Sequence, residues 1–195
     1  MRNIAIFASG SGTNAQKLIE YFSNKKTAKV KLILSNNADA LVLERARKFS
    51  ITARIFDRDD LYTYGKVLKM LLENDIYFIV LAGFLWLIPD EILDHFPGRV
   101  VNIHPALLPD YGGKGMYGSR VHRAVIDNKE KESGISIHYV NSRYDEGDII
   151  FQARCDVRPD DSPESLAERI HMLEHQYYPR IVEEVILKAQ NESNS

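Results

Sequence analysis

An asparagine and a histidine stand two positions apart at the end of a short apolar run, in the segment Val100-Val101-Asn102-Ile103-His104-Pro105. Residues two apart in a strand project from the same face, so the Asn102 amide and the His104 imidazole would share one pocket at the strand's end. An amide N–H and a protonated imidazole can both donate to a developing oxyanion, and the imidazole can also carry a proton. The spacing therefore indicates acid–base and oxyanion chemistry. The structural alternative is an Asn102 that caps a turn and a His104 that fills a loop.

A glycine-rich loop, Ser9-Gly10-Ser11-Gly12-Thr13-Asn14, follows the apolar run 4–8 and opens a helical pattern. Its glycines permit a tight turn with free N–H groups, and the helix N-terminus adds positive potential, so the loop suits a phosphate. It lacks the third glycine of dinucleotide-binding loops and the Gly-Lys-Ser/Thr ending of NTP-binding loops, which favours a monophosphate. The alternative is a plain strand-to-helix turn capped by Thr13 or Asn14.

An acidic segment, 140–148, joins two late apolar stretches. A carboxylate there could return over the sheet's edge to His104, where its charge would favour the imidazolium and raise the His pKa. Spacing alone does not choose between Asp145, Glu146 and Asp148, and an ordinary acidic hairpin turn is the other reading. Two further histidines, His138 and His171, could lie near the site or serve the structure only.

Short apolar stretches alternate with helical patterns along most of the chain, which is typical of a doubly wound, mainly parallel α/β sheet of Rossmann-like type. Strands are predicted over 4–8, 30–34, 53–55, 77–81 and 99–103, with helices from Asn14, over 41–49, 60–73 and 120–128, and after Pro89. The segments 135–140 and 149–157 predict an antiparallel C-terminal edge. A long final helix is expected from Pro163, after a Ser162 N-cap, through Ala189. Ligands of such sheets collect at the carboxyl ends of the strands.

Length and composition favour one globular domain over 1–190, because the 195 residues are 45% hydrophobic; the polar residues 191–195 are expected to fray. The formal net charge of −2 argues against an extended nucleic-acid surface. The longest near-apolar stretch, 76–88, is too short to cross a membrane as a helix, and the N-terminus has no signal-like run. The single cysteine, Cys155, indicates a reducing compartment, and we expect a cytoplasmic protein.

A collinear series of segments resembles the formyltransferase family that uses 10-formyltetrahydrofolate. The matching segments are Ser9 to Asn14, 35–40, 43–47, 81–84, Asn102-Ile103-His104-Pro105-Ala106-Leu107-Leu108-Pro109, Tyr144-Asp145-Glu146-Gly147 and Glu174-His175. The resemblance implies transfer of a formyl group from 10-formyltetrahydrofolate, as cosubstrate, to the amine of 5′-phosphoribosylglycinamide in purine (IMP) biosynthesis, without a metal.

The same resemblance implies residue roles. Asn102, His104 and Asp145 match the family's catalytic residues, with protonated His104 kept charged by Asp145. Gly12, Thr13 and Asn14 match the loop for the substrate phosphate, and Glu174 matches an acidic residue at its ribose or glycinamide end. The backbone of Leu85, Trp86, Leu87 and Ile88 matches the stretch that receives the pterin, and 140–145, from Val140 to Asp145, would close over it so that Asn102 and Asp145 also touch the folate.

The sequence departs from the family at three places. Some relatives read Phe-Met-Arg-Ile-Leu where this chain has Phe84-Leu85-Trp86-Leu87-Ile88. The position of a folate-tail arginine aligns with Asp59, beside Arg58, and the loop from Asp110 to Gly118 is unusually long and rich in glycine. The alternatives are a formyltransferase for another amine, such as a nucleotide sugar, and a nucleotide-binding or regulatory module.

Overall fold

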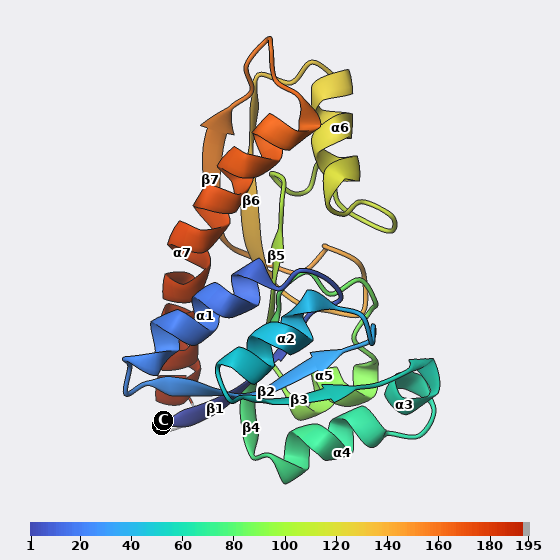
Figure 1. Cartoon of the computed structure of the whole chain (residues 1–195), viewed down its shortest axis with the longest axis vertical. Coiled ribbons are helices and arrows are strands. Elements are labelled where there is room, and N and C mark those ends of the chain that lie inside the picture. The colour runs from blue at the N-terminus through green and yellow to red at the C-terminus, as the bar shows by residue number, and fades with distance from the viewer. Residues whose placement is uncertain (193–195) are drawn as a thin grey trace.

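A seven-stranded sheet forms the centre of the molecule, with the strand order β3-β2-β1-β4-β5-β6-β7 (Figure 1). The computed structural model describes residues 1–192. The strands are β1 (Arg2–Phe7), β2 (Ala28–Ser35), β3 (Thr52–Ile55), β4 (Ile76–Leu81), β5 (Val100–His104), β6 (Glu132–Tyr139) and β7 (Ile149–Asp156). The first five pair in parallel, while β6 and β7 pair antiparallel at one side of the sheet. This confirms the predicted fold class.

The helices lie on both faces of this sheet. They are α1 (Thr13–Ser23), α2 (Leu41–Lys48), α3 (Arg58–Tyr62), α4 (Lys66–Glu73), α5 (Asp90–His95), α6 (Ser119–Asp127) and α7 (Pro163–Glu192). The prediction of one helix over 60–73 is wrong, because Gly65, with a φ of 61°, separates α3 from α4. Helix α7 continues past Ala189 to Glu192, and residues 193–195 lie outside the described residues, so the frayed tail stays a prediction there.

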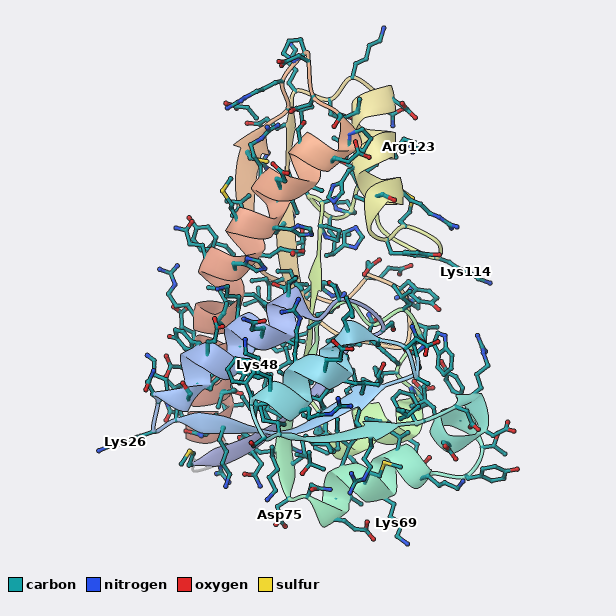
Figure 2. The ribbon with its side chains drawn as sticks, viewed as in Figure 1. Lys26, Lys48, Lys69, Asp75, Lys114 and Arg123 are labelled. Atoms are coloured by element: carbon teal, nitrogen blue, oxygen red, sulfur yellow. The ribbon has the colours of Figure 1, made fainter. Side chains whose placement is uncertain are left out.

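Two hydrophobic clusters fill the spaces between the sheet and its helices. On β1, Ile4 and Ile6 face the cluster under α1, α2 and α7, whereas Ala5 and Phe7 face the cluster over α3, α4 and α5. A strand buried on both faces reads as a continuous apolar run, as the sequence of β1 does. Charged side chains such as Lys26, Lys69 and Asp75 point outward (Figure 2). Among residues 1–192, no helix is long and apolar enough to span a membrane.

The carboxyl ends of β1, β4 and β5 lie beside one another, since their register pairs Phe7 with Leu81 and Leu81 with Asn102. The loops that leave these strands are tied together. The N–H of Ser9 donates to the carbonyl of Gly83 at 3.0 Å, and the Ser9 hydroxyl accepts from the N–H of Leu85 at 3.2 Å. This edge of the sheet therefore forms a continuous rim on which a site can be built.

Candidate active site

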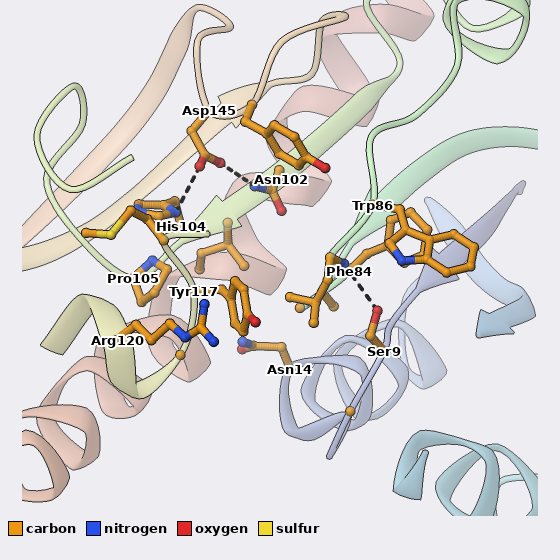
Figure 3. A pocket seen from close by; sticks show the side chains of 18 of the residues that line it. Ser9, Asn14, Phe84, Trp86, Asn102, His104, Pro105, Tyr117, Arg120 and Asp145 are labelled. Atoms are coloured by element: carbon orange, nitrogen blue, oxygen red, sulfur yellow. Dashed lines mark hydrogen bonds and ion pairs between the residues drawn. The ribbon is translucent and has the colours of Figure 1, made fainter. Parts of the chain in front are cut away.

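A cavity of about 550 Å³ opens at this rim (Figure 3). Most residues that the sequence singled out line it: Asn102, His104 and Asp145, the loop residues Gly12, Thr13 and Asn14, Glu174 on α7, and Leu85 and Trp86 after β4. Leu87, Ile88 and Val140 are not among its lining residues. The structure thus brings together the catalytic and phosphate-loop candidates, and only the first half of the proposed pterin stretch.

Asp145 reaches the cavity from the segment between β6 and β7, where its backbone has a φ of 57°. Its Oδ2 accepts from the N–H of Gly113 at 3.0 Å and lies 3.5 Å from His104 Nδ1. Burial alone would raise the pKa of this carboxyl, but His138, His104 and the Gly113 N–H together lower that pKa below its ordinary value. Asp145 therefore carries a negative charge at neutral pH.

His104 is 3% exposed and is held at both ring nitrogens. Its Nε2 lies 2.7 Å from the backbone oxygen of Tyr111. Because a carbonyl can only accept, Nε2 carries the proton and donates, which leaves Nδ1 facing Asp145. Burial lowers the pKa of His104 below 6.5, and it outweighs the opposing effects of Asp145 and the Tyr111 carbonyl.

The expectation that Asp145 keeps His104 charged stays a prediction, because two opposing effects act on the pKa of His104. The carboxylate acts in the predicted direction, but the loss of hydration is the larger effect. The ring nitrogen that faces Asp145 is Nδ1. That nitrogen can accept a proton, and the resulting imidazolium would face two acceptors, the Asp145 carboxylate and the Tyr111 carbonyl.

Asn102 differs from expectation in the direction of its hydrogen bonds. Its Nδ2 lies 3.1 Å from His138 Nε2 and donates to Asp145 Oδ1 at 3.4 Å. The side-chain oxygen points away from both partners, into the cavity (Figure 3). In this arrangement Nδ2 lies beside His138 and Asp145, and the expected donation from Asn102 to an oxyanion stays a prediction.

The loop after β1 presents the start of α1 to the cavity. Gly12 takes the N-cap position with a φ of 70°, and no side chain caps the helix, contrary to the capping roles considered for Thr13 and Asn14. A Cβ at Gly12 would lie 2.6 Å from the Cβ of Val42, so glycine is required there by space as well as by φ. The first N–H groups of α1 are left available to a ligand.

Glu174 closes the same end of the cavity from α7. Its Oε2 accepts from Asn14 Nδ2 at 2.8 Å, which joins residues 160 positions apart. The side chain is 6% exposed. Burial raises the pKa of this carboxyl above its ordinary value, and the Asn14 amide and His171 offset the effect only in part.

Several lining residues escaped the sequence reasoning, because they come from the glycine-rich loop before α6 and from α6 itself. Arg120 points toward Asn14 in Figure 3, with its guanidinium 4.9 Å from the Tyr117 ring centroid. His122 is buried, its Nδ1 has no hydrogen-bond partner in the described part of the chain, and burial lowers its pKa to about 4. The one signal in the sequence is the run of glycines from 112 to 118, which lets this segment fold over the cavity.

Aromatic side chains form the opposite wall. The ring centroids of Phe84 and Trp86 lie 6.3 Å apart, and the Arg58 guanidinium lies 5.0 Å from the Trp86 ring centroid. Ile88 and Val140 instead pack with the hydrophobic cluster beneath. Within 1–192, no group of three or more His, Cys, Asp or Glu residues is arranged to hold a metal ion.

Comparison with known proteins places these features in context. The sequence pattern of the formyl transferase family matches residues 2–182. The chloroplastic phosphoribosylglycinamide formyltransferase of Arabidopsis thaliana is 38% identical over 187 residues, which are 93% of this chain and 64% of that protein. Phosphoribosylglycinamide formyltransferase of Escherichia coli is 35% identical, covering 92% of this chain and 85% of that protein. The crystal structure of phosphoribosylglycinamide formyltransferase from Bacillus halodurans superimposes with a TM-score of 0.87 at 34% identity, over 97% of this chain and 98% of that one.

Proposed function

The chain belongs to the formyl transferase family, and from this premise we propose that it transfers a formyl group from 10-formyltetrahydrofolate to the amine of 5′-phosphoribosylglycinamide, a step of purine biosynthesis. One observation carries the proposal. A proton-accepting group, His104 backed by Asp145, shares a single cavity with a helix N-terminus suited to a monophosphate.

The phosphate end of the cavity would hold the substrate. The free N–H groups at Gly12, Thr13 and Asn14 supply donors, and the Arg120 guanidinium, which lines the same cavity, supplies a positive charge. Glu174, whose pKa is raised, would face the ribose or the glycinamide chain. These contacts fix one end of the substrate, so that its amine lies toward Asn102 and His104.

The wall formed by Leu85 and Trp86 suits the flat ring system of the folate. It is apolar and aromatic, and it lies beside Asn102 in the same cavity. The folate, when bound, supplies the formyl carbon and a nitrogen leaving group. Ile88 and Val140 would support this wall from beneath, with Leu87 contributing its backbone carbonyl to the hydroxyl of Tyr62 at 2.8 Å.

His104 would move the proton. As the neutral amine attacks the formyl carbon, its nitrogen loses a proton to His104 Nδ1, and the imidazolium is stabilised by Asp145 at 3.5 Å and by the Tyr111 carbonyl at 2.7 Å. His104 Nδ1 then returns that proton to the folate nitrogen that leaves the formyl carbon. Burial lowers the pKa of His104, which favours the neutral ring that can accept this proton.

The cavity draws residues from the loop after β1 and from α7, so we propose that 1–190 acts as one domain. Cys155 is free, which fits a reducing compartment, and we propose the cytoplasm.

The proposal is tested by incubating the protein with 10-formyltetrahydrofolate and a panel of amines, with mass detection of formylated products. Phosphoribosylglycinamide should be formylated, whereas glycinamide without the phosphoribosyl group should show a much lower kcat/KM, because it lacks the phosphate that orients the substrate. The control is His104→Ala, in which kcat should fall by about a hundredfold to ten-thousandfold. Equal kcat/KM values for both amines would remove the phosphate-loop assignment, and preference for a nucleotide sugar would redirect the function.

A further inference from the structure

His122 lies in the wall of the cavity, and the protein gives its ring no hydrogen bond. The residue is 3% exposed and lines the cavity from α6. Within residues 1–192, its Nδ1 is buried without a partner, and its Nε2 makes no hydrogen bond either. Buried polar groups in folded proteins nearly always have a partner, so the partner of this ring must come from the cavity.

The two ring nitrogens of His122 differ in what can reach them. Nδ1 is closed off by the surrounding protein, whereas Nε2, at the tip of the ring, is not among the polar atoms that are both buried and unpaired. Because Nε2 also has no protein partner, it retains some accessible surface, and that surface lies toward the cavity. Nε2 is therefore the atom that a ligand in the cavity meets.

The place of His122 on α6 is one that an apolar side chain would normally fill. Val121 and Val125 are buried on the same helix, and Val125 packs in the hydrophobic cluster shared with α7. A polar ring without a protein partner lowers stability at such a position. Residues that lower stability in this way are typical of functional sites, so the ring is expected to serve a ligand rather than the fold.

Along the cavity, His122 lies near both ends of the proposed substrate. Burial lowers the pKa of His122 to about 4, and charges on His171 and His104 act in the same direction, so both residues are close to it. His171 belongs to α7, which closes the phosphate end, while the amine of the substrate lies toward His104. The ribose joins the phosphate to the glycinamide, and it would therefore pass His122.

We propose that His122 binds a ribose hydroxyl of the substrate through Nε2 and thereby selects a ribose over a deoxyribose. This inference rests on the proposed function and adds a contact from α6 to it. A hydroxyl group both donates and accepts, so it can pair with Nε2 whether or not that nitrogen carries a proton. A phosphate or carboxylate can only accept, and a ring whose pKa is lowered offers it little positive charge. An analogue without the hydroxyl leaves Nε2 unpaired at a buried position, which is how a site rejects it.

Calorimetric titration of the intact protein tests this contact without any formyl transfer. The ligands are 5′-phosphoribosylglycinamide and its 2′-deoxy and 3′-deoxy analogues. In the wild-type protein, at least one analogue should bind about tenfold to a hundredfold more weakly than the ribose compound. In His122→Leu, the preference over one analogue should fall below about threefold, while the preference over the other is retained, and the analogue affected identifies the hydroxyl.

Two further variants serve as comparisons. His122→Gln carries a side-chain amide that can again bind a hydroxyl, so most of the preference should remain. His95→Leu makes the same exchange as His122→Leu at an exposed position on α5, and it should leave all three affinities unchanged.

Urea denaturation without ligand separates a binding role from a structural one. His122→Leu should be at least as stable as the wild-type protein, because an apolar side chain replaces an unpaired polar ring. A clear loss of stability, or failure of this variant to fold, would overturn the inference, since the ring would then serve the fold.

The binding results distinguish failure of the inference from failure of the proposed function. Equal binding of all three compounds by the wild-type protein, or an unchanged preference in His122→Leu, would overturn the ribose contact even where phosphoribosylglycinamide is formylated. If the wild-type protein binds none of the three compounds and formylates another amine, the proposed function fails and the ribose contact fails with it.

Discussion

Two buried carboxyl groups line the same cavity, yet their pKa values shift in opposite directions. Asp145 stands at the end of the cavity near β5, where His104, His138 and the N–H of Gly113 surround it and hold its pKa low. Glu174 stands at the other end, where burial raises its pKa and the Asn14 amide is its one hydrogen-bond partner among the contacts in the described chain. Burial penalises both charges, so the partners decide which carboxyl stays ionised.

The contrast indicates that the two carboxyl groups have different functions in the cavity. An Asp145 carboxylate whose pKa is lowered can stabilise an imidazolium at neutral pH, which a neutral acid could not do. A carboxyl with a raised pKa at Glu174 is better suited to hydrogen bonding with hydroxyl or amide groups of a substrate, since it can both donate and accept when protonated. The two ends are therefore expected to respond differently to removal of the charge.

For the two carboxyl groups, the largest expected effect is that of Asp145→Asn. Loss of the negative charge should lower the pKa of His104 further and remove the partner of the imidazolium, so kcat should fall about a hundredfold to a thousandfold. Steady-state kinetics measures the first effect, and NMR titration of His104 measures the second. An unchanged or raised His104 pKa in this variant would remove the role given to Asp145, even if the variant were inactive.

A smaller effect is expected for Glu174→Gln. Glutamine resembles the protonated acid and can still accept from Asn14, so kcat/KM for the substrate should change less than about tenfold. Glu174→Ala is the matched comparison, because it also removes the acceptor and leaves Asn14 unpaired. A loss in Glu174→Gln as large as that in Asp145→Asn would show that both carboxylates act through their charge, and the contrast between them would disappear.

Stability should depend on pH with opposite signs at the two sites. The folded pKa of Glu174 is raised, so its favourable contribution is complete below about 4.5 and is lost as pH rises through the folded pKa. Glu174→Gln should therefore gain in free energy of unfolding, relative to wild type, as pH increases.

The folded pKa of Asp145 is lowered, so its contribution is present above about 3.8 and is lost as pH falls through the folded pKa. Asp145→Asn should accordingly be the less stable protein at neutral pH and approach wild type in acid. Urea denaturation at a series of pH values measures both trends, and trends of the same sign would contradict the assignment.

The smallest expected effect concerns the helix that carries Glu174. Tyr178, one turn further along α7, is fully buried and donates to the carbonyl of Leu81 at 2.7 Å. Tyr178→Phe should lower the free energy of unfolding by about 1 to 2 kcal/mol and leave kcat within about twofold, because the ring still fills its place. Denaturation and kinetics on one preparation test this, and a large loss of kcat would show that Glu174 depends on this single hydrogen bond for its position.

The parts of the fold that follow from side-chain pattern were predictable. The apolar run of β1 and its alternation with helices indicated a parallel sheet, and the spacing of Asn102 and His104 placed both at one strand end. Spacing could not select Asp145 from Glu146 and Asp148; that choice came from the resemblance to a family. The break at Gly65 was missed because the helical periodicity continues across it.

The remaining features of the site depend on backbone groups, which any residue type can supply. The Tyr111 carbonyl on His104 and the Gly113 N–H on Asp145 follow from the conformation of the glycine-rich loop, and no pattern of side chains encodes them. The contact of Asn102 Nδ2 with His138 Nε2 likewise depends on the antiparallel register of β5 and β6, which places the two residues opposite one another. The lowered pKa of His104 follows from the depth of its burial, which becomes known only with the packed structure.

The bond between Asn14 and Glu174 also has a consequence for how the chain is made. It joins residues 160 positions apart, so the first strand and its loop leave the ribosome long before their partner helix does. Until α7 is synthesised, the cluster formed by Ile4, Ile6 and Leu18 is uncovered on the side where Tyr178 and Val182 will pack. At roughly 5–20 residues per second, that helix alone takes about 2 to 6 seconds to make. The nascent chain therefore passes through an interval in which its apolar face is open to chaperones and its substrate pocket is incomplete. Pulse proteolysis of ribosome-bound chains stalled before and after residue 163 would measure that interval.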